Sequence, residues 1–582
     1  MSNRQFNTGV LAATLVLVHP LLAQADPPRG PLVPKDPTAV SCSHPTTALS
    51  GQVTLDSSCI YTQSFTIKAS DTTLDCNGAQ LESDDSYLVN VSGEVENVTV
   101  KNCYVTGGKG VAVRAPKQKA GETDEELRQR SPRNVVFTNL HIAQSTNVGM
   151  YIHHHVVGAT IKDSVIVDNS SAGVYLSPYG QQSVVQNNLI QGNGHIKPDG
   201  LPRVGWYRRE GVAVDGSSLH VIEGNHFDNN AIGGVLLYKN CWEHAATNPD
   251  STPRTDHAHS NIIRNNVFSS MPFGVWIASR QSMDLVEMEC GDPTPYANPI
   301  ILFNFFHPTY ASHKSSYASM YLPWVSVWPD FAENNVVEGN VFAEIALGAV
   351  RVEDDDARVT GNFFLGDFDY VFVGAPFRAK LDSHPVLDTV ISDNSFFSPV
   401  AQVFDEHLAL IPEEHEGTVL SNNYRACQTP WGTWLHHGAS VTAYVSDGTA
   451  PGGCGEEVRT CNDGTLDGSY ADEVCDPAPW VDGGVDAQDA GAMEDGGGEP
   501  VDAGPNPSDE GGLDASGSSE VGGGDTADAG NNDDNAPSAT QPSTSSDGGC
   551  RVGRGAAGSW PLLALAALAA LSRRRRAAAT RE

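Results

Sequence analysis

Positive charge is scarce in this sequence. Its 582 residues contain 35 Lys and Arg against 71 Asp and Glu, which gives a formal net charge of −36. Nucleic-acid binding needs clustered Lys and Arg to neutralise phosphates, so the composition argues against a nucleic-acid partner. The deficit is also uneven, because the stretch from Thr460 to Gly549 holds 21 acidic residues and no Lys or Arg, whereas seven Arg follow Cys550. A single fold of uniform composition is therefore excluded.

Apolar runs with a targeting pattern stand at the two ends of the chain. Residues 9–22 are apolar, follow Arg4 and precede Ala-Gln-Ala at 23–25, which predicts a secretory signal peptide over 1–25. Residues 556–572 are apolar and precede four consecutive Arg. The order of Gly-Gly-Cys550, apolar segment and Arg cluster resembles the C-terminal sorting signals of myxobacterial type, which implies anchoring through Cys550. A plain tail anchor is the alternative, and both predict an exported, surface-anchored protein with a membrane partner.

The number of cysteines, eleven, is odd for an exported chain. If Cys550 is the anchoring residue, ten remain for disulfides in an oxidising compartment. Proximity in the sequence favours the pairs Cys42–Cys59, Cys76–Cys103, Cys241–Cys290, Cys461–Cys475 and Cys427–Cys454.

Internal repeats organise the middle of the chain. A β-branched pair, an Asn and two apolar residues are followed by Gly-Val-x-Val, and the Asn or Asp recurs at steps of 22 to 25 residues wherever no insertion intervenes. Its positions are Asn139, Asp163, Asn188, Asn225, Asn266, Asn340, Asn362, Asn394 and Asn423. Units of this length bury their apolar residues only by stacking, which predicts a parallel β-helix. A β-sandwich, the alternative, gives no reason for an Asn at a fixed phase. The Asn suits a left-handed turn and can form a hydrogen-bonded ladder.

The predicted fold class is therefore all-β, a right-handed parallel β-helix with a disordered acidic C-terminal stalk. One helix is expected, over Glu122–Arg130 in an insertion. We divide the chain into a signal peptide (1–25), an N-terminal segment and cap (26–80), β-helix repeats (81–430), a Cys-rich module (431–480), a disordered acidic linker (481–549) and a C-terminal sorting signal (550–582).

Stacking also aligns the outward-facing positions of the Gly-Val-x-Val strands. The first predicted column is Tyr151, Tyr175, Ala213, Leu236, Trp276 and Arg351. The second is His153, Ser177, Asp215, Tyr238, Ala278 and Glu353. Exposed aromatic and ionisable side chains in a row suit an extended polymer, and the predicted substrate-binding residues are Tyr151, His153, Tyr175, Asp215, Trp276 and Arg351. The alternative is that these rings cover the edges of inserted loops.

The repeats and this strip resemble the right-handed β-helix proteins of the pectate-lyase-like class. The resemblance covers about two thirds of the chain, and it is specific for fold but not for function. Within that class the Tyr238-Lys239-Asn240 strand end is most similar to lyases of uronate polymers such as alginate, which implies an anionic polysaccharide as partner. The Asp-Pro-His pattern of mannuronan epimerases and the paired Asp of polygalacturonase-type hydrolases are both absent.

Uronate β-elimination needs a cation on the carboxylate, a base and a proton donor. The predicted catalytic residues are Lys239 as base, Arg280 or Arg209 as carboxylate neutraliser, and Tyr207 or Tyr238 as proton donor. A surface Lys at a turn and an ion pair of Arg280 with a nearby Glu are the competing interpretations.

We expect no cofactor and a monomer. The acidic run from Glu353 to Asp356 suits Ca²⁺, but a solvated acidic turn is the default interpretation. The three His from 153 to 155 suit a metal or an acid/base role, but such a run is more often plain polar surface. An epimerase is the second enzyme candidate after the lyase, and two further classes stay open: a carbohydrate-binding or adhesive surface protein, and a purely structural envelope protein.

Overall fold

The computed structural model describes residues 40–84, 86–203, 208–240, 254–278, 299–301, 324–326, 331–366, 371–375, 385–397, 415–446 and 454–475. All of them lie in the first of two compact units, Met1–Val485. The predicted signal peptide, acidic linker and sorting signal lie outside the described residues. Within the described part, no helix has the length and apolarity needed to cross a membrane.

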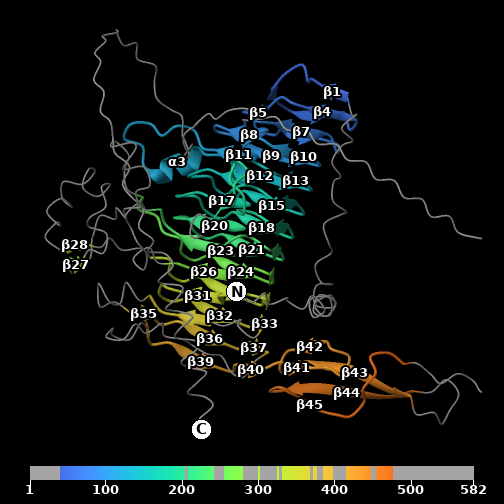
Figure 1. The fold of residues 1–582 in the computed structure, drawn as a ribbon. Coiled ribbons are helices and arrows are strands. Elements are labelled where there is room, and N and C mark those ends of the chain that lie inside the picture. The colour runs from blue at the N-terminus through green and yellow to red at the C-terminus, as the bar shows by residue number, and fades with distance from the viewer. Residues whose placement is uncertain are drawn as a thin grey trace, which may run out of the picture. The chain divides into compact units, whose positions relative to one another are not determined.

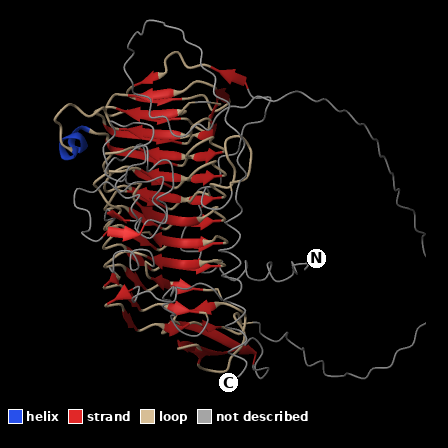
Figure 2. Ribbon diagram, turned by 60° about the vertical axis from the view of Figure 1, so that its left-hand side comes forward, coloured by secondary structure: helices blue, strands red, loops and turns tan. Residues whose placement is uncertain are grey.

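Three long parallel sheets wind around a common interior, and each turn of the chain adds one strand to each sheet (Figures 1 and 2). Sheet A contains β1 (Val40–Cys42), β4 (Cys59–Tyr61), β7 (Gln80–Ser83), β10 (Tyr104–Gly107), β13 (His141–Ala143), β16 (Val165–Val167), β19 (Leu189–Gln191), β22 (His226–Asp228), β25 (Val267–Ser269), β30 (Val341–Ala343), β33 (Phe363–Phe364), β37 (Ser395–Phe396) and β40 (Tyr424–Arg425).

Sheet B contains β2 (Ala48–Leu49), β5 (Phe65–Ile67), β8 (Val89–Ser92), β11 (Val111–Arg114), β14 (Met150–Ile152), β17 (Val174–Leu176), β20 (Val212–Asp215), β23 (Gly233–Tyr238), β26 (Phe273–Ile277), β31 (Gly348–Val352) and β34 (Val371–Val373). Sheet C contains β3 (Gln52–Thr54), β6 (Thr73–Asp75), β9 (Glu96–Lys101), β12 (Arg133–Thr138), β15 (Thr160–Lys162), β18 (Val184–Gln186), β21 (Val221–Glu223), β24 (Ile262–Arg264), β29 (Val336–Glu338), β32 (Arg358–Thr360), β36 (Val390–Ser392) and β39 (Val419–Ser421). This is the parallel β-helix that the repeats predicted.

Smaller pairings lie outside the three sheets. They are β27 (Pro299–Ile301) with β28 (Trp324–Ser326), β35 (Val386–Leu387) with β38 (His415–Glu416), β41 (Cys427–Gln428) with β42 (Trp434–Leu435), and the three-stranded sheet of β43 (Ser440–Ser446), β44 (Cys454–Asn462) and β45 (Thr465–Leu466). The expected helix is α3 (Asp124–Arg130), which begins after a capping box formed by Thr123 and Glu126.

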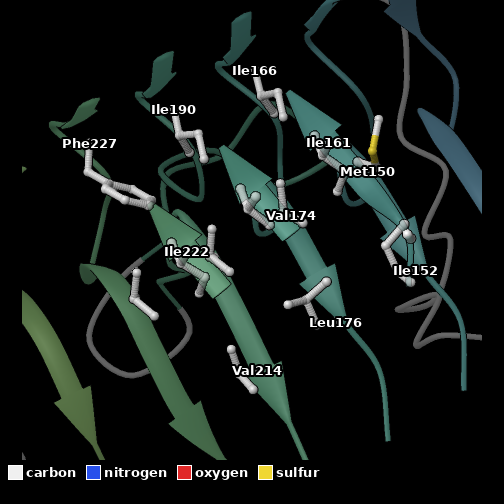
Figure 3. Close-up of a cluster of buried hydrophobic side chains, with 14 of the residues drawn as sticks. Met150, Ile152, Ile161, Ile166, Val174, Leu176, Ile190, Val214, Ile222 and Phe227 are labelled. Carbon is white, nitrogen blue, oxygen red and sulfur yellow. The ribbon is translucent and has the colours of Figure 1, made fainter. Parts of the chain in front are cut away.

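Side chains alternate between the interior and the outside along each strand. In β14 and β17 the first and third residues are buried and the middle residue is partly exposed. Figure 3 shows the inward-pointing set, which includes Met150, Ile152, Ile161, Ile166, Val174, Leu176, Ile190, Val214, Ile222 and Phe227. Each coil contributes a single strand to each sheet, so its inward-pointing side chains are buried only because the neighbouring coils cover them.

A stack of Phe rings explains the Gly that opens the Gly-Val-x-Val strands. Successive ring centroids lie 4.8, 4.9, 5.1 and 4.5 Å apart along Phe227, Phe268, Phe342, Phe364 and Phe396. A Cβ atom at Gly234 would lie 2.4 Å from the ring of Phe268, and one at Gly274 would lie 2.5 Å from that of Phe342. Carbon atoms cannot approach so closely, and the ring therefore excludes every residue except Gly from these positions.

The predicted Asn ladder is present at the turn between sheets C and A. Each amide Nδ2 donates to the Oδ1 of the Asn in the next coil at 2.9–3.0 Å, along Asn188, Asn225, Asn266, Asn340, Asn362, Asn394 and Asn423. These amides are largely buried, so the ladder satisfies polar groups that water cannot reach.

The two roles expected of the Asn fall on two successive residues. The left-handed conformation belongs to the residue before the ladder position, as at Asn187 with φ 54°, Asn265 with φ 53° and Gly339 with φ 62°. Asn139 and Asp163, predicted in phase with the ladder, occupy this left-handed position instead. Asn, Asp and Gly tolerate that conformation best, which is why they alternate there.

Two of the predicted disulfides are confirmed and two are wrong. Cys42–Cys59 and Cys76–Cys103 form as expected, but the C-terminal pairs are Cys427–Cys461 and Cys454–Cys475 rather than Cys461–Cys475 and Cys427–Cys454. The turn after β44 explains the exchange. Its Asp463 accepts a 2.9 Å hydrogen bond from the Arg425 backbone N–H, which brings Cys461 to the end of the last coil. Cys241–Cys290 lies outside the described residues.

A histidine replaces Asn in a second, shorter ladder. His220 Nδ1 accepts a hydrogen bond from the Ser183 backbone N–H at 3.0 Å, and its own backbone N–H donates to Asn261 Oδ1 at 3.0 Å. Burial lowers the pKa of His220 from its ordinary 6.5 to about 3. Protonation of Nδ1 would also remove the acceptor that Ser183 uses, so the folded coil requires the neutral ring.

The pH dependence of stability tests this requirement. A folded-state pKa below the unfolded one means that stability is complete above about pH 6.5 and is lost as the pH falls toward about 3. His220→Asn, which continues the ladder with an amide, should therefore lose about 2 kcal/mol less unfolding free energy than wild type between about pH 7 and about pH 5. Denaturant unfolding at both pH values measures the difference. Equal losses in the two proteins would contradict the assignment.

Candidate functional site

The outer face of sheet B carries the strip of side chains that the repeats aligned. Its strands pair in the predicted register: Tyr151 with Tyr175, Tyr175 with Ala213, Ala213 with Leu236, Leu236 with Trp276, and Trp276 with Arg351. Asp215 pairs with Tyr238 in the second column. The two columns therefore run across neighbouring coils about 4.8 Å apart.

Much of this strip is buried, and the expectation of exposed aromatic rings is wrong for its central coils. Leu236, Tyr238 and Trp276 are 6, 9 and 4 % exposed and pack in one apolar cluster with Phe273. Tyr151 and Tyr175 keep partial exposure, and their rings stack with centroids 5.5 Å apart. Large apolar rings on an outer face are covered wherever the fold provides a cover, because their burial is favourable.

Asp215 is the centre of a polar cluster on this face. Its side chain is fully buried, and it accepts hydrogen bonds from the Tyr175 hydroxyl and from the Arg254 guanidinium. Its second oxygen accepts the backbone N–H of Asn240 at 2.7 Å. The Asn240 amide lies 3.5 Å from the Tyr175 hydroxyl. Burying a carboxylate is costly unless it is paired, and here a cation, a phenol and an amide satisfy it together.

The Tyr238-Lys239-Asn240 strand end lies directly beside this cluster. Tyr238 donates its hydroxyl hydrogen to Glu210 at 2.8 Å, and both residues are buried. Lys239 is fully buried, and its Cγ lies 3.6 Å from where a Cβ of Gly216 would stand. Lys239, Tyr238 and the Glu210 carboxylate bound by Tyr238 are thus all enclosed at this strand end.

The three consecutive histidines divide between two settings. His153 belongs to the strip, where its ring meets Tyr151 edge-on at 5.4 Å. His155 stacks on Tyr179 at 4.7 Å and binds Asp124 of α3 at 2.9 Å. Burial lowers the pKa of the His155 imidazole, and the Asp124 carboxylate opposes that shift. His155 therefore serves to hold α3 at the edge of sheet B.

The far end of the strip is acidic. The Arg351 guanidinium lies over the Trp276 ring at 5.0 Å and forms a 2.7 Å ion pair with Glu353. Asp354 accepts the backbone N–H of Ala332 at 2.7 Å. In the part of the chain that the structure describes, no group of three or more His, Cys, Asp or Glu is placed to hold a metal ion.

Several predicted site residues are not brought together here. Tyr207 and Arg280 lie outside the described residues. Arg209 is half-buried, and its Cβ lies 2.6 Å from where a Cβ of Gly194 would stand. Its neighbour Glu210 is the residue that reaches Tyr238.

Arg254 and Glu210 are the functional candidates that the repeats did not reveal. Both come from insertions between coils, which have no period and therefore no predictable place on the strip. The signal for them was that each insertion adjoins a strand of the aligned set: the insertion of Glu210 precedes β20, and that of Arg254 follows β23.

Fold and strip together define a right-handed parallel β-helix protein with a buried polar cluster on one outer face. Residues 88–288 match the family model described as a right-handed β-helix region, which agrees with the predicted hand and fold. Among functionally curated proteins, no sequence matches the chain.

Solved structures with a similar course of the chain include an epimerase, a lyase and a protein in complex with an oligosaccharide. The mannuronan C-5 epimerase AlgE6 A-module of Azotobacter vinelandii is 12 % identical, with 64 % of this chain and 85 % of that chain covered and a TM-score of 0.36. An alginate lyase from Paenibacillus is 12 % identical, with 59 and 91 % covered and a TM-score of 0.29. A tailspike protein of the E. coli bacteriophage HK620, in complex with a pentasaccharide, is 11 % identical, with 66 and 55 % covered and a TM-score of 0.32. Similarity this low decides nothing about what this chain acts on.

The Asp215–Arg254 pair offers a test of the cluster by stability. Asp215→Ala leaves the Arg254 guanidinium without its carboxylate and should lower the unfolding free energy by about 3–5 kcal/mol. Adding Arg254→Ala to it should cost much less than the sum of the two single changes, because the pair acts as a unit. Denaturant unfolding of the four proteins gives the coupling energy. The more exposed pair Arg264–Glu223 is the control, and its coupling should stay below about 1 kcal/mol. Additive losses at Asp215 and Arg254 would refute the cluster.

Proposed function

We propose that this chain is an exported polysaccharide-active enzyme, a lyase that cleaves an anionic uronate polymer by β-elimination at the Asp215 cluster. One observation carries the proposal: a buried carboxylate on an outer face of the solenoid is bound by both a phenol and a guanidinium. Packing alone does not require that arrangement, and groups held in this way are typical of catalytic sites. The disulfides Cys42–Cys59 and Cys76–Cys103 support export to an oxidising compartment.

The cation of the proposed site is Arg254. The proton on C5 of a uronate becomes acidic only when the adjacent carboxylate is neutralised. A guanidinium has five N–H donors in a rigid fork, and Asp215 engages one nitrogen of Arg254. The Arg254 side chain is 17 % exposed, which lets its positive charge face the carboxylate of the sugar.

The proposed proton-transfer group is the hydroxyl of Tyr175. This residue is partly exposed, and Asp215 accepts its phenolic hydrogen, which turns the oxygen lone pairs away from the carboxylate. The Tyr175 oxygen passes its own hydrogen to Asp215 as it takes the C5 proton, while the C4–O4 bond breaks and the C4=C5 double bond forms. Tyr175 then donates a proton to the leaving O4 on the same face of the sugar and regains its hydrogen from Asp215, so the elimination is balanced without a co-reactant.

The enclosure of Lys239 changes the role proposed for it. A residue with no exposed surface does not meet a polymer directly, and its place beside Gly216 suits it to hold the β23 strand end and Asn240 against Asp215. Lys239 therefore becomes a positioning residue, and Tyr238 with Glu210 supports the same strand end.

The stacked rings of Tyr151 and Tyr175 favour a second candidate, a carbohydrate-binding or adhesive protein without catalysis. Such rings present flat apolar faces at little cost in conformational entropy, and they serve sugar binding whether or not a bond is cleaved.

Product formation separates the two candidates. Wild-type protein incubated with a panel of uronate polymers should release unsaturated oligosaccharides, which are detected by ultraviolet absorbance of the new double bond conjugated with the carboxylate. Tyr175→Phe keeps the ring and removes the hydroxyl, so it should lower kcat by about 100-fold or more while polymer binding persists. Tyr424→Phe, in the last strand of sheet A, is the matched control and should leave kcat unchanged. Binding without product from wild type would replace the lyase by the binding protein, and neither binding nor product would refute both.

A further inference from the structure

A second group of polar and aromatic side chains lies on sheet B, toward its N-terminal coils. Asn90 and Ser92 of β8 face outward, and β8 pairs with β11 so that Ser92 stands beside Arg114. The Arg114 guanidinium lies over the Tyr87 ring at 4.7 Å. Tyr87 in turn stacks on Tyr151 with centroids 6.4 Å apart, which joins this patch to the strip.

The patch differs from the Asp215 cluster because three of its buried polar atoms have no hydrogen-bond partner in the part of the chain that the structure describes. Asn90 Oδ1, Ser92 Oγ and Arg114 Nε are buried, and none of them has a hydrogen-bond partner among the residues that the structure describes. Nor does any carboxylate in these residues pair with Arg114. Buried polar atoms without partners cost free energy, and three on neighbouring strands indicate that something else satisfies them.

The opposite end of the strip has the reverse character. Arg351 is already paired with Glu353, and Asp354 and Asp355 follow, all three acidic residues being buried. An anionic polymer is repelled by that end and attracted by the unpaired guanidinium of Arg114.

We propose that Asn90, Ser92 and Arg114, with the rings of Tyr87 and Tyr151, form a binding subsite for a carboxylate-bearing sugar. The polymer then runs from Asp215 toward the N-terminal coils and not toward Glu353. This inference rests on the proposed function for the identity of the polymer. Asn90, Ser92 and Arg114 are partly exposed as residues, unlike Lys239. Arg114 binds the sugar carboxylate, Asn90 and Ser92 bind its hydroxyl groups, and the rings contact its apolar face.

The geometry sets the length of polymer that the subsite needs. β11 and β20 are separated by β14 and β17, three steps between coils, so Arg114 and Asp215 stand on strands about 14 Å apart. An oligosaccharide shorter than this span reaches one of the two places, whereas a longer one reaches both.

Binding of uronate oligosaccharides of increasing length tests the subsite. Titration calorimetry with Arg114→Ala should show an affinity about 10-fold to 100-fold lower than wild type for oligosaccharides longer than the span, and unchanged affinity for short ones that bind at Asp215. Arg114→Lys should recover part of the loss, because charge remains but the bidentate fork does not. Arg358→Ala, an exposed arginine on sheet C, is the matched control and should bind every length as wild type does.

Three outcomes would overturn the subsite: unchanged affinity of Arg114→Ala for long uronates, an equal loss at every length, or an equal loss for neutral oligosaccharides. The result is independent of catalysis. If Tyr175→Phe and wild type are both inactive while Arg114→Ala still weakens long uronates selectively, the lyase proposal fails and the subsite stands. If activity depends on Tyr175 but Arg114→Ala behaves as wild type, the subsite fails and the lyase stands.

Discussion

The fixed register of one coil on the next is the constraint on which everything else in this protein depends. Backbone hydrogen bonds between parallel strands set the spacing between coils. The Asn ladder prevents each coil from sliding over its neighbour, because a shift of one residue would leave buried amides without hydrogen-bond partners. The Phe stack and the Gly residues beside it add a steric lock of the same register. Side chains on the outer face of sheet B therefore have fixed neighbours, and a chemical cluster such as that of Asp215 can be built from residues far apart in the sequence.

That cluster shows how side chains on the outer face of a solenoid become buried. Tyr175 and Asp215 come from strands, whereas Arg254 and Glu210 come from insertions that reach the same face. Strands alone would leave these groups in water, where a carboxylate and a guanidinium attract each other weakly. Buried together, they hold one another in a defined geometry, and a phenol bound to the same carboxylate gains a fixed orientation for its hydroxyl.

The repeats predicted the fold and the alignment of the strip because both follow from period alone. The columns through Tyr151 and through Asp215 needed only the phase of Gly-Val-x-Val, and the structure pairs them as expected. The repeat period could not predict which side chains of the strip are buried or which groups they bind. Nothing in the repeat indicates that Trp276 is buried, or that Arg254, which comes from an insertion, reaches Asp215. The Asn ladder at the turn was predicted correctly, but the left-handed conformation belongs to the residue before each ladder Asn. The buried amide and the left-handed backbone are two separate requirements, and two successive residues meet them.

The ladder also accounts for the uneven spacing of the repeats. Its hydrogen bonds stay at 2.9–3.0 Å although successive members are separated by 37, 41, 74, 22, 32 and 29 residues along the chain. The strands and the ladder therefore keep a constant spacing between coils, whatever the length of the insertion between two successive Asn residues. An insertion at such a point lengthens the chain without changing the height of any coil above it. Segments such as the one that carries Arg254 can thus be exchanged between variants of this scaffold, and the specificity of the sheet B face can change while the solenoid beneath it stays the same.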